Sequence, residues 1–138
     1  MATATAKRET LNVPEWANGV RVGKNGIIFV GGKMDTLDAS VYRAGPYSLE
    51  RYGNDRQWNF WSEGKSRLGF GRSFEAMRWY ATKMFFKDLI GNAYGEVVEF
   101  FKAPTPAGDW LTFRVLADKL DDLGHDEAAA LVRHFLPK

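Results

Sequence analysis

The sequence predicts an α+β fold, in which an antiparallel β-meander of about four to six strands packs on a central helix and a C-terminal helical hairpin packs on the core. Three observations lead to this prediction. Short apolar runs between residues 20 and 70 are separated by glycine-rich turns, which is typical of antiparallel strands. Residues 74–90 have the apolar spacing of a helix, and residues 109–135 contain two further helical patterns around a glycine.

The composition indicates one folded domain with no disulfide chemistry. The chain has 138 residues, of which 45% are hydrophobic and 14% aromatic, and this excludes a disordered chain. It has no cysteine, which excludes thiol nucleophiles and cysteine-based zinc sites. The first residues lack the apolar stretch of a secretory leader, and the longest strongly apolar run, Ile27–Val30, is too short to cross a bilayer. We therefore expect a cytoplasmic protein with no membrane segment.

The charge is small overall but unevenly distributed. The formal net charge is +2, which demands no strongly polyanionic partner. Residues 42–90 carry nine basic and five acidic side chains, whereas residues 91–138 carry five basic and eight acidic ones. The chain therefore has a basic middle part and an acidic C-terminal part.

Three segments organise the chain: a flexible tail at 1–10, an α+β core domain at 11–102, and a helical hairpin at 103–138 packed on the core. The tail is small and polar, with nothing to bury. The core domain is expected to begin with a hairpin of residues 20–22 and 27–30 around Asn25-Gly26. Gly31-Gly32 is expected to end this hairpin, and residues 34–40 to be irregular or a single helical turn.

The meander is expected to contain strands near residues 47–52, 57–62 and 67–70. Because side chains alternate along a strand, one set faces the core and the next set faces away. The core set is Tyr47, Leu49, Trp58, Phe60, Leu68 and Phe70. The opposite set is Ser48, Glu50, Tyr52, Gln57, Asn59, Trp61 and Arg67, in which two aromatic rings lie among polar groups.

Ser73 is a suitable N-cap for a helix over residues 74–90, and Gly91 supplies its end. This helix is apolar on two sides. One stripe consists of Phe74, Met77, Tyr80, Ala81, Met84, Phe85 and Leu89, and a second cluster of Trp79, Phe86 and Ile90. The sheet can cover only one side. The second side needs the C-terminal region, chiefly Phe113, Leu116 and Leu120, or another protein chain.

The remaining segments are simpler. Residues 94–102 fit either a strand or a short helix, and residues 103–108 fit a loop. Asp109 is expected to cap the first helix of the hairpin, Gly124 to end it, and Asp126 to cap the second.

No arrangement of residues indicates catalysis, so we expect a protein that is not an enzyme and needs no cofactor. The two histidines, His125 and His134, lie at a helix end and in a last helical turn, without a nucleophile motif. The acidic residues around Gly124 lack the ligand spacing of a calcium loop, which favours a solvated helix end and no metal site. The run Gly69–Arg72 fits either a plain turn or a place where a helix N-terminus holds one anion.

The remaining candidate site is the polar and aromatic face of the meander. It presents Tyr52, Asn59, Trp61 and Arg67, edged by Arg56, Lys65 and Arg72. Nucleic-acid surfaces combine cations for phosphates with planar groups that stack on bases or bind their edges. The sequence therefore predicts a small binding protein for nucleic acid. Two alternatives remain open: a protein-interaction module of phage or bacterial origin, such as an inhibitor or adaptor, using the same aromatic face, or a face covered by the rest of the chain, with Trp61 in the core.

Three antiparallel strands followed by a helix, with Leu68-Gly69-Phe70, Phe74-Glu75-Ala76 and Tyr80-Ala81, resemble the AP2-type DNA-binding domain and the N-terminal domains of some phage integrases. The resemblance covers about a third of the chain. It implies DNA contacts from the sheet through Arg56, Trp61 and Arg67. Separately, residues 115–120 with Gly124 resemble a leucine-alanine-aspartate helical hairpin of bacterial proteins, a motif that implies no activity.

Overall fold

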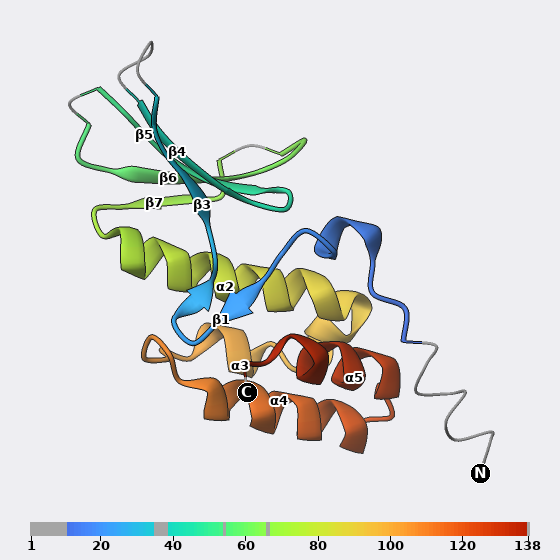
Figure 1. Cartoon of the computed structure of the whole chain (residues 1–138). Coiled ribbons are helices and arrows are strands. Elements are labelled where there is room, and N and C mark those ends of the chain that lie inside the picture. Colours follow the sequence, from blue (N-terminus) through green and yellow to red (C-terminus); the bar gives the residue numbers. More distant parts are fainter. Residues whose placement is uncertain (1–10, 35–38, 54, 66, 138) are drawn as a thin grey trace.

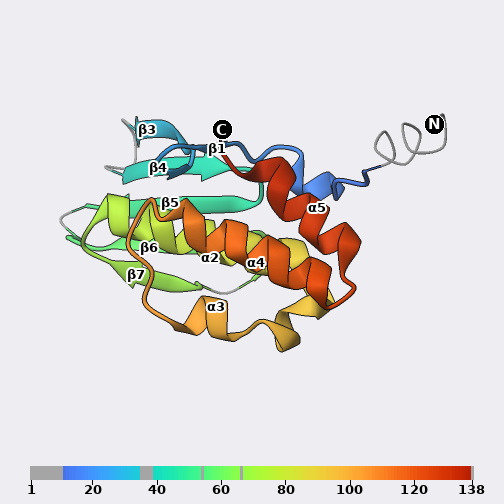
Figure 2. The same ribbon diagram turned by 90° about the horizontal axis from the view of Figure 1, so that it is seen from below.

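The computed structural model describes residues 11–34, 39–53, 55–65 and 67–137, which form three layers (Figure 1). A five-stranded antiparallel sheet is one outer layer. Helix α2 (Phe74–Ile90) lies beneath it, and helices α4 (Trp110–Asp122) and α5 (Asp126–Phe135) form the third layer (Figure 2). The predicted α+β class, with an antiparallel meander and a C-terminal helical pair, is confirmed. The expected flexible tail lies outside the described residues.

The sheet is a meander in which neighbours in sequence are neighbours in space. Its strands follow the order β3 (Val30–Met34), β4 (Ala39–Ala44), β5 (Tyr47–Tyr52), β6 (Trp58–Ser62) and β7 (Gly69–Gly71). Strand β5 has the predicted bounds, whereas β6 begins one residue and β7 two residues later than expected.

The glycine pair that was expected to end a hairpin lies inside a strand. Strand β3 runs through Gly31 and Gly32 and pairs with β4, so the expected irregular segment is wrong at Met34 and at the first residues of β4. A Cβ atom on Gly31 would lie 2.1 Å from the Val41 carbonyl oxygen. The glycine therefore permits a close approach of two backbones, and pattern reasoning mistook it for a turn.

Phe70 points away from the core, contrary to the prediction. It pairs with Asn59 and is 54% exposed, while Gly69 and Gly71 face α2. A Cβ on Gly69 would lie 2.9 Å from Tyr80 Cε2, so the strand packs too closely on the helix for a side chain there. The glycines face inward and the phenylalanine takes the other face.

The N-terminal segment packs beside α2 instead of joining the sheet (Figure 1). After a short 3₁₀ helix, η1 (Glu15–Ala17), it forms a hairpin of two-residue strands, β1 (Val22–Gly23) and β2 (Gly26–Ile27). The turn at Asn25-Gly26 is where the sequence predicted it, but both strands are shorter than expected, and Val30 belongs to β3 instead of the hairpin.

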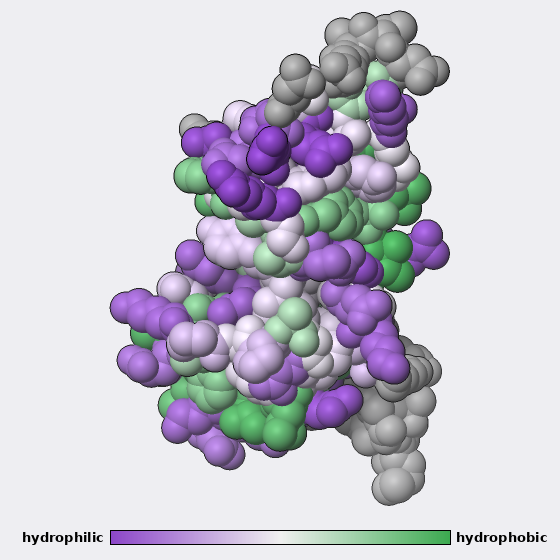
Figure 3. Space-filling view, turned by 90° about the vertical axis from the view of Figure 1, so that its left-hand side faces the viewer, coloured by the Kyte–Doolittle hydropathy of each residue, from purple (hydrophilic) through white to green (hydrophobic). Residues whose placement is uncertain are grey.

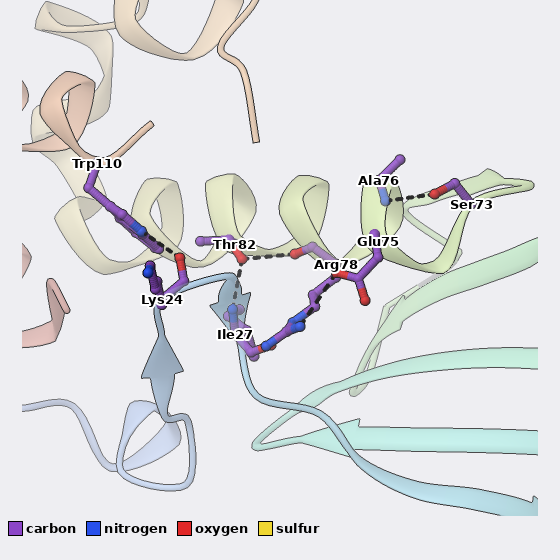
Figure 4. Close-up of polar contacts among 8 residues, drawn as sticks. All are labelled: Lys24, Ile27, Ser73, Glu75, Ala76, Arg78, Thr82 and Trp110. Carbon is purple, nitrogen blue, oxygen red and sulfur yellow. Dashed lines mark hydrogen bonds and ion pairs between the residues drawn. The ribbon is translucent and has the colours of Figure 1, made fainter. Parts of the chain in front are cut away.

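Hydrogen bonds fix this hairpin to the helices (Figure 4). The Ile27 N–H donates to Thr82 Oγ1 over 2.9 Å, and the Thr82 hydroxyl donates to the Arg78 carbonyl over 2.8 Å. Arg78 Nε in turn donates to the Ile27 carbonyl over 2.6 Å. Trp110 Nε1 donates to the Lys24 carbonyl over 2.8 Å. The backbone of the hairpin is thus bound from α2 and from α4.

The second apolar side of α2 is covered from within the chain. Trp79, Phe86 and Ile90 are buried, and the ring of Phe113 lies 4.6 Å from that of Phe86. Trp110, which the sequence analysis did not include in this cluster, lies 5.1 Å from Trp79 between ring centroids. Of the two alternatives for this side of α2, the C-terminal region therefore covers it, and not another protein chain.

The remaining helical segments differ from expectation at their ends. The 3₁₀ helix η2 (Gly91–Glu96) and α3 (Glu99–Lys102) show that residues 94–102 are largely helical. Asp109 occupies the N-cap position of α4, but its carboxylate accepts from the Thr112 hydroxyl instead of a backbone N–H. His125, and not Asp126, is the N-cap residue of α5.

No helix in the described ranges is both long enough and apolar enough to cross a membrane.

A fragment that ends at Ala103 should lose its cooperative fold or aggregate. Removing α4 and α5 would expose Trp79, Phe86 and Ile90, which are at most 6% exposed in the full chain. Thermal unfolding and size-exclusion chromatography of the fragment, with the full chain as control, test this. A soluble fragment 1–103 with a cooperative transition would contradict it.

Thr82→Val should destabilise the fold more than Thr82→Ser. Valine keeps the shape but leaves the buried Ile27 N–H without an acceptor, at a cost of about 1–3 kcal/mol. Serine keeps the hydroxyl and loses one methyl group, about 0.8 kcal/mol. Urea denaturation measures both free energies of unfolding. If Thr82→Ser proved the less stable variant, the hydroxyl would not be what holds the hairpin.

Candidate functional site

The face of the sheet that points away from α2 is uncovered by the described helices. All of them, and the β1–β2 hairpin, lie on the other side (Figures 1 and 2). We call this surface the outer face. By strand register it includes Val30, Met34, Val41, Arg43, Ser48, Glu50, Tyr52, Asn59, Trp61 and Phe70. The alternative in which the hairpin or the C-terminal helices cover this face is therefore wrong.

Arg67 is held on the outer face by two neighbours. Its Nη1 donates to Asn59 Oδ1 over 2.9 Å, and its guanidinium carbon lies 4.6 Å from the centroid of the Phe70 ring. Asn59 is only 8% exposed and also donates weakly, over 3.5 Å, to the Glu50 carbonyl. The amide of Asn59 therefore orients Arg67 and is not presented to a ligand, while Arg67 remains exposed.

On strand β5 a carboxylate organises two hydroxyl groups. Glu50 accepts from the Ser48 hydroxyl over 2.7 Å and from the Tyr52 hydroxyl. This hydrogen bond to Glu50 raises the pKa of the Tyr52 phenol above its usual range. The Tyr52 ring is 46% exposed, so the contact fixes a ring that is accessible from outside.

Trp61 pairs with Ser48 across strands β5 and β6 and is half-buried. Its indole N–H is buried and finds no hydrogen-bond acceptor within the described part of the chain. The polar edge of the ring is thus enclosed, and Trp61 offers less free ring surface than Tyr52 or Phe70.

The remaining predicted site residues lie at the margins. Arg56 is exposed in the connection from β5 to β6, and Arg72 is exposed between β7 and α2. Lys65 lines a different pocket of about 340 Å³ together with Trp16, Tyr47 and Asp88. The structure therefore brings Tyr52, Asn59, Trp61 and Arg67 to one face, and it does not bring Lys65 there.

Sequence reasoning missed the cation Arg43 and the ring of Phe70, together with the aliphatic residues Val30, Met34 and Val41 of this face. Arg43 belongs to β4, a strand that was not predicted, and Phe70 was assigned to the core. The glycines that flank Phe70 face inward because the strand packs tightly on α2, and the local sequence does not reveal this close approach.

The surface is not uniform. In Figure 3, hydrophilic side chains lie at the top, in the middle and at the lower left of the face shown, and hydrophobic patches lie at its upper right and at its base. Leu111 and Val115 of α4 are 64% and 46% exposed.

The histidines and the acidic residues form no common centre. His125 Nε2 contacts the Glu96 carboxylate, whereas His134 lies at the other end of α5. Arg133 forms ion pairs with Asp118 over 2.8 Å and with Asp121 over 2.6 Å. The second pair explains why Asp121 is tolerated near the C-terminal end of α4. No group of three or more potential metal ligands occurs among residues 11–34, 39–53, 55–65 and 67–137.

The Gly69–Arg72 segment is explained by packing. Gly71 faces Met77, whose Sδ would lie 2.9 Å from an added Cβ, and Ser73 Oγ accepts from the Ala76 N–H. The glycines thus have a structural reason, and the first turn of α2 already has its cap.

No protein-family model matches the chain, and no curated protein or solved structure matches it either.

The buried Tyr47 hydroxyl, which donates to Asp88 Oδ2 over 2.7 Å, should make stability depend on alkaline pH. Burial, and then Asp88, raise the pKa of Tyr47 above that of an unfolded tyrosine, about 10. The neutral phenol therefore stabilises the fold below pH about 10, and this contribution is lost as the pH rises further. Tyr47→Phe removes the contribution at every pH, so its deficit in unfolding free energy should shrink between pH 10 and 11. A constant deficit from pH 7 to 11 in chemical denaturation would contradict the assignment.

Proposed function

We propose that this protein is a non-enzymatic nucleic-acid-binding protein and that the outer face is its binding surface. The observation that carries the proposal is the arrangement of Arg67, which Asn59 and Phe70 hold in place on a sheet face that the described helices leave open. A cation next to an exposed ring is the pairing that contacts both the phosphate and the base of a nucleotide.

The charges of the outer face indicate how a strand would lie on it. Arg43 on β4 and Arg67 beside β7 are exposed cations on either side of the central strand. Glu50 lies between them and would repel a phosphate, although two hydroxyl groups donate to its carboxylate. Phosphates would therefore bind at the two cations, and bases would lie over the rings.

The wider charge balance agrees with a modest electrostatic contribution. Residues 42–90 carry four more basic than acidic side chains, nine against five, and the whole chain has a formal net charge of +2. Few phosphate contacts mean a shallow dependence of affinity on salt.

One observation favours a second candidate, a protein partner. Val30 and Met34, on the β3 side of the outer face, are 65% and 42% exposed, and they pair with Arg43 and Ala39 of β4. Exposed apolar side chains that lie together on one face are typical of protein interaction sites. A protein-binding adaptor or inhibitor would use this same face.

Arg67→Ala should weaken nucleic-acid binding and reduce the salt dependence of the binding constant. The variant loses one phosphate contact and the counterions released with it, so the slope of log K against log salt should fall by about 0.7–0.9. Fluorescence anisotropy over a salt series measures both quantities. Arg114→Ala, an exposed arginine on α4, is the matched control and should leave both unchanged.

Equal affinities and slopes for the wild type and Arg67→Ala would show that the outer face does not bind the nucleic acid. Absence of binding by the wild type at low salt would overturn the nucleic-acid proposal. The protein-partner candidate would then be the one to pursue.

A further inference from the structure

We infer that the outer face binds single-stranded nucleic acid and not a duplex, an inference that rests on the proposed function. Two properties of the sheet carry it: its width across the strands, and the placement of its two most exposed rings.

The sheet is too wide for the groove of a DNA duplex. Five strands spaced about 4.8 Å apart span about 19 Å, whereas the major groove of B-DNA is about 12 Å wide. The resemblance to three-stranded DNA-binding domains fails at this point, because β3 and β4 extend the sheet beyond the three strands of that pattern. Asn59 and Glu50 lie in the middle of the sheet, so a duplex resting on its edges would keep its base edges away from them.

The exposed rings suit bases that are separated from one another. Phe70 on β7 is opposite Asn59, which is opposite Glu50, and Tyr52 is two residues beyond Glu50 on β5. Two strand spacings and one two-residue step place the Cα atoms of the two residues about 12 Å apart. Stacked bases in one strand of a duplex are about 3.4 Å apart and have no free faces. Bases on both rings would therefore belong to an extended strand.

The rings are also held in place before any ligand binds. The Arg67 guanidinium lies over Phe70, so a base would stack on this pair, and the hydroxyl of Tyr52 is bound by Glu50. Aromatic and guanidinium planes that are fixed in this way accept any base, because every base has a flat face. The inference therefore concerns strandedness and predicts weak sequence preference.

Four fluorescein-labelled probes of equal length test the inference by anisotropy with the full chain: dT16, rU16, a 16-base-pair DNA duplex and a 16-base-pair RNA duplex. We expect dT16 or rU16 to bind at least tenfold more tightly than either duplex at the same salt concentration. A difference between dT16 and rU16 would report on the sugar and the 5-methyl group of the base together.

Phe70→Leu provides the variant, because leucine keeps an apolar side chain at the site and removes only the flat ring. It should weaken single-strand binding by about 5- to 100-fold, as expected for the loss of one stacked base. Leu111→Ala, an exposed apolar residue on α4, is the matched control and should change the affinity less than twofold. Circular dichroism confirms that both variants are folded.

The outcomes separate this inference from the function on which it rests. A duplex that binds as tightly as the single strands, or more tightly, overturns the inference and leaves nucleic-acid binding intact. Unchanged single-strand affinity in Phe70→Leu also overturns it. If none of the four probes binds at low salt, the proposed function itself is wrong.

Discussion

Helix α2 is buried on two sides, and the other layers take their positions by packing on it. Phe85 and Met77 face the sheet side of the core, and Trp79 and Phe86 face the C-terminal helices, all with exposures of 6% or less. A helix that is apolar around most of its circumference gains stability only when both sides are covered. The sheet covers one side and the α4–α5 pair the other, and this leaves the outer face of the sheet as the surface that the described helices do not occupy.

Because α2 is buried, polar groups on it need hydrogen-bond partners within the protein, and Thr82 has such partners. Thr82 is completely buried in the helix, facing the N-terminal hairpin. Its hydroxyl oxygen accepts a hydrogen bond from the Ile27 N–H, and its hydroxyl group donates one to the Arg78 carbonyl. The hydroxyl therefore acts both as acceptor and as donor. Gly26, with φ 112°, lets the hairpin backbone come this close, since a Cβ there would lie 2.7 Å from Thr82 Oγ1.

The sequence predicts this fold where the signals are local, and it fails where distant packing decides. Ser73 and Gly91 determine the ends of α2, and turn residues determine the ends of β5, so both elements have their predicted bounds. The inward glycines of β7 and the glycines inside β3 depend on how closely another element approaches, which no local pattern contains.

The candidate site, too, was predicted where local signals place its residues and missed where distant packing does. Alternation along β5 and β6 places Tyr52 and Asn59 with Trp61, whereas Arg43 and Phe70 emerge only with the full sheet.

The hydrogen bond from the Trp110 indole to the Lys24 carbonyl joins residues separated by 86 positions in the sequence. During synthesis on the ribosome, the whole sheet and α2 leave the exit tunnel before Trp110 does, because all of them precede it in the chain. The meander contains only pairings between consecutive strands, so its contacts can form as each strand emerges. The Lys24 carbonyl must meanwhile remain bonded to water. The sheet can therefore assemble early during translation. The N-terminal hairpin gains its last hydrogen bond, from Trp110, only when the C-terminal helices have been made.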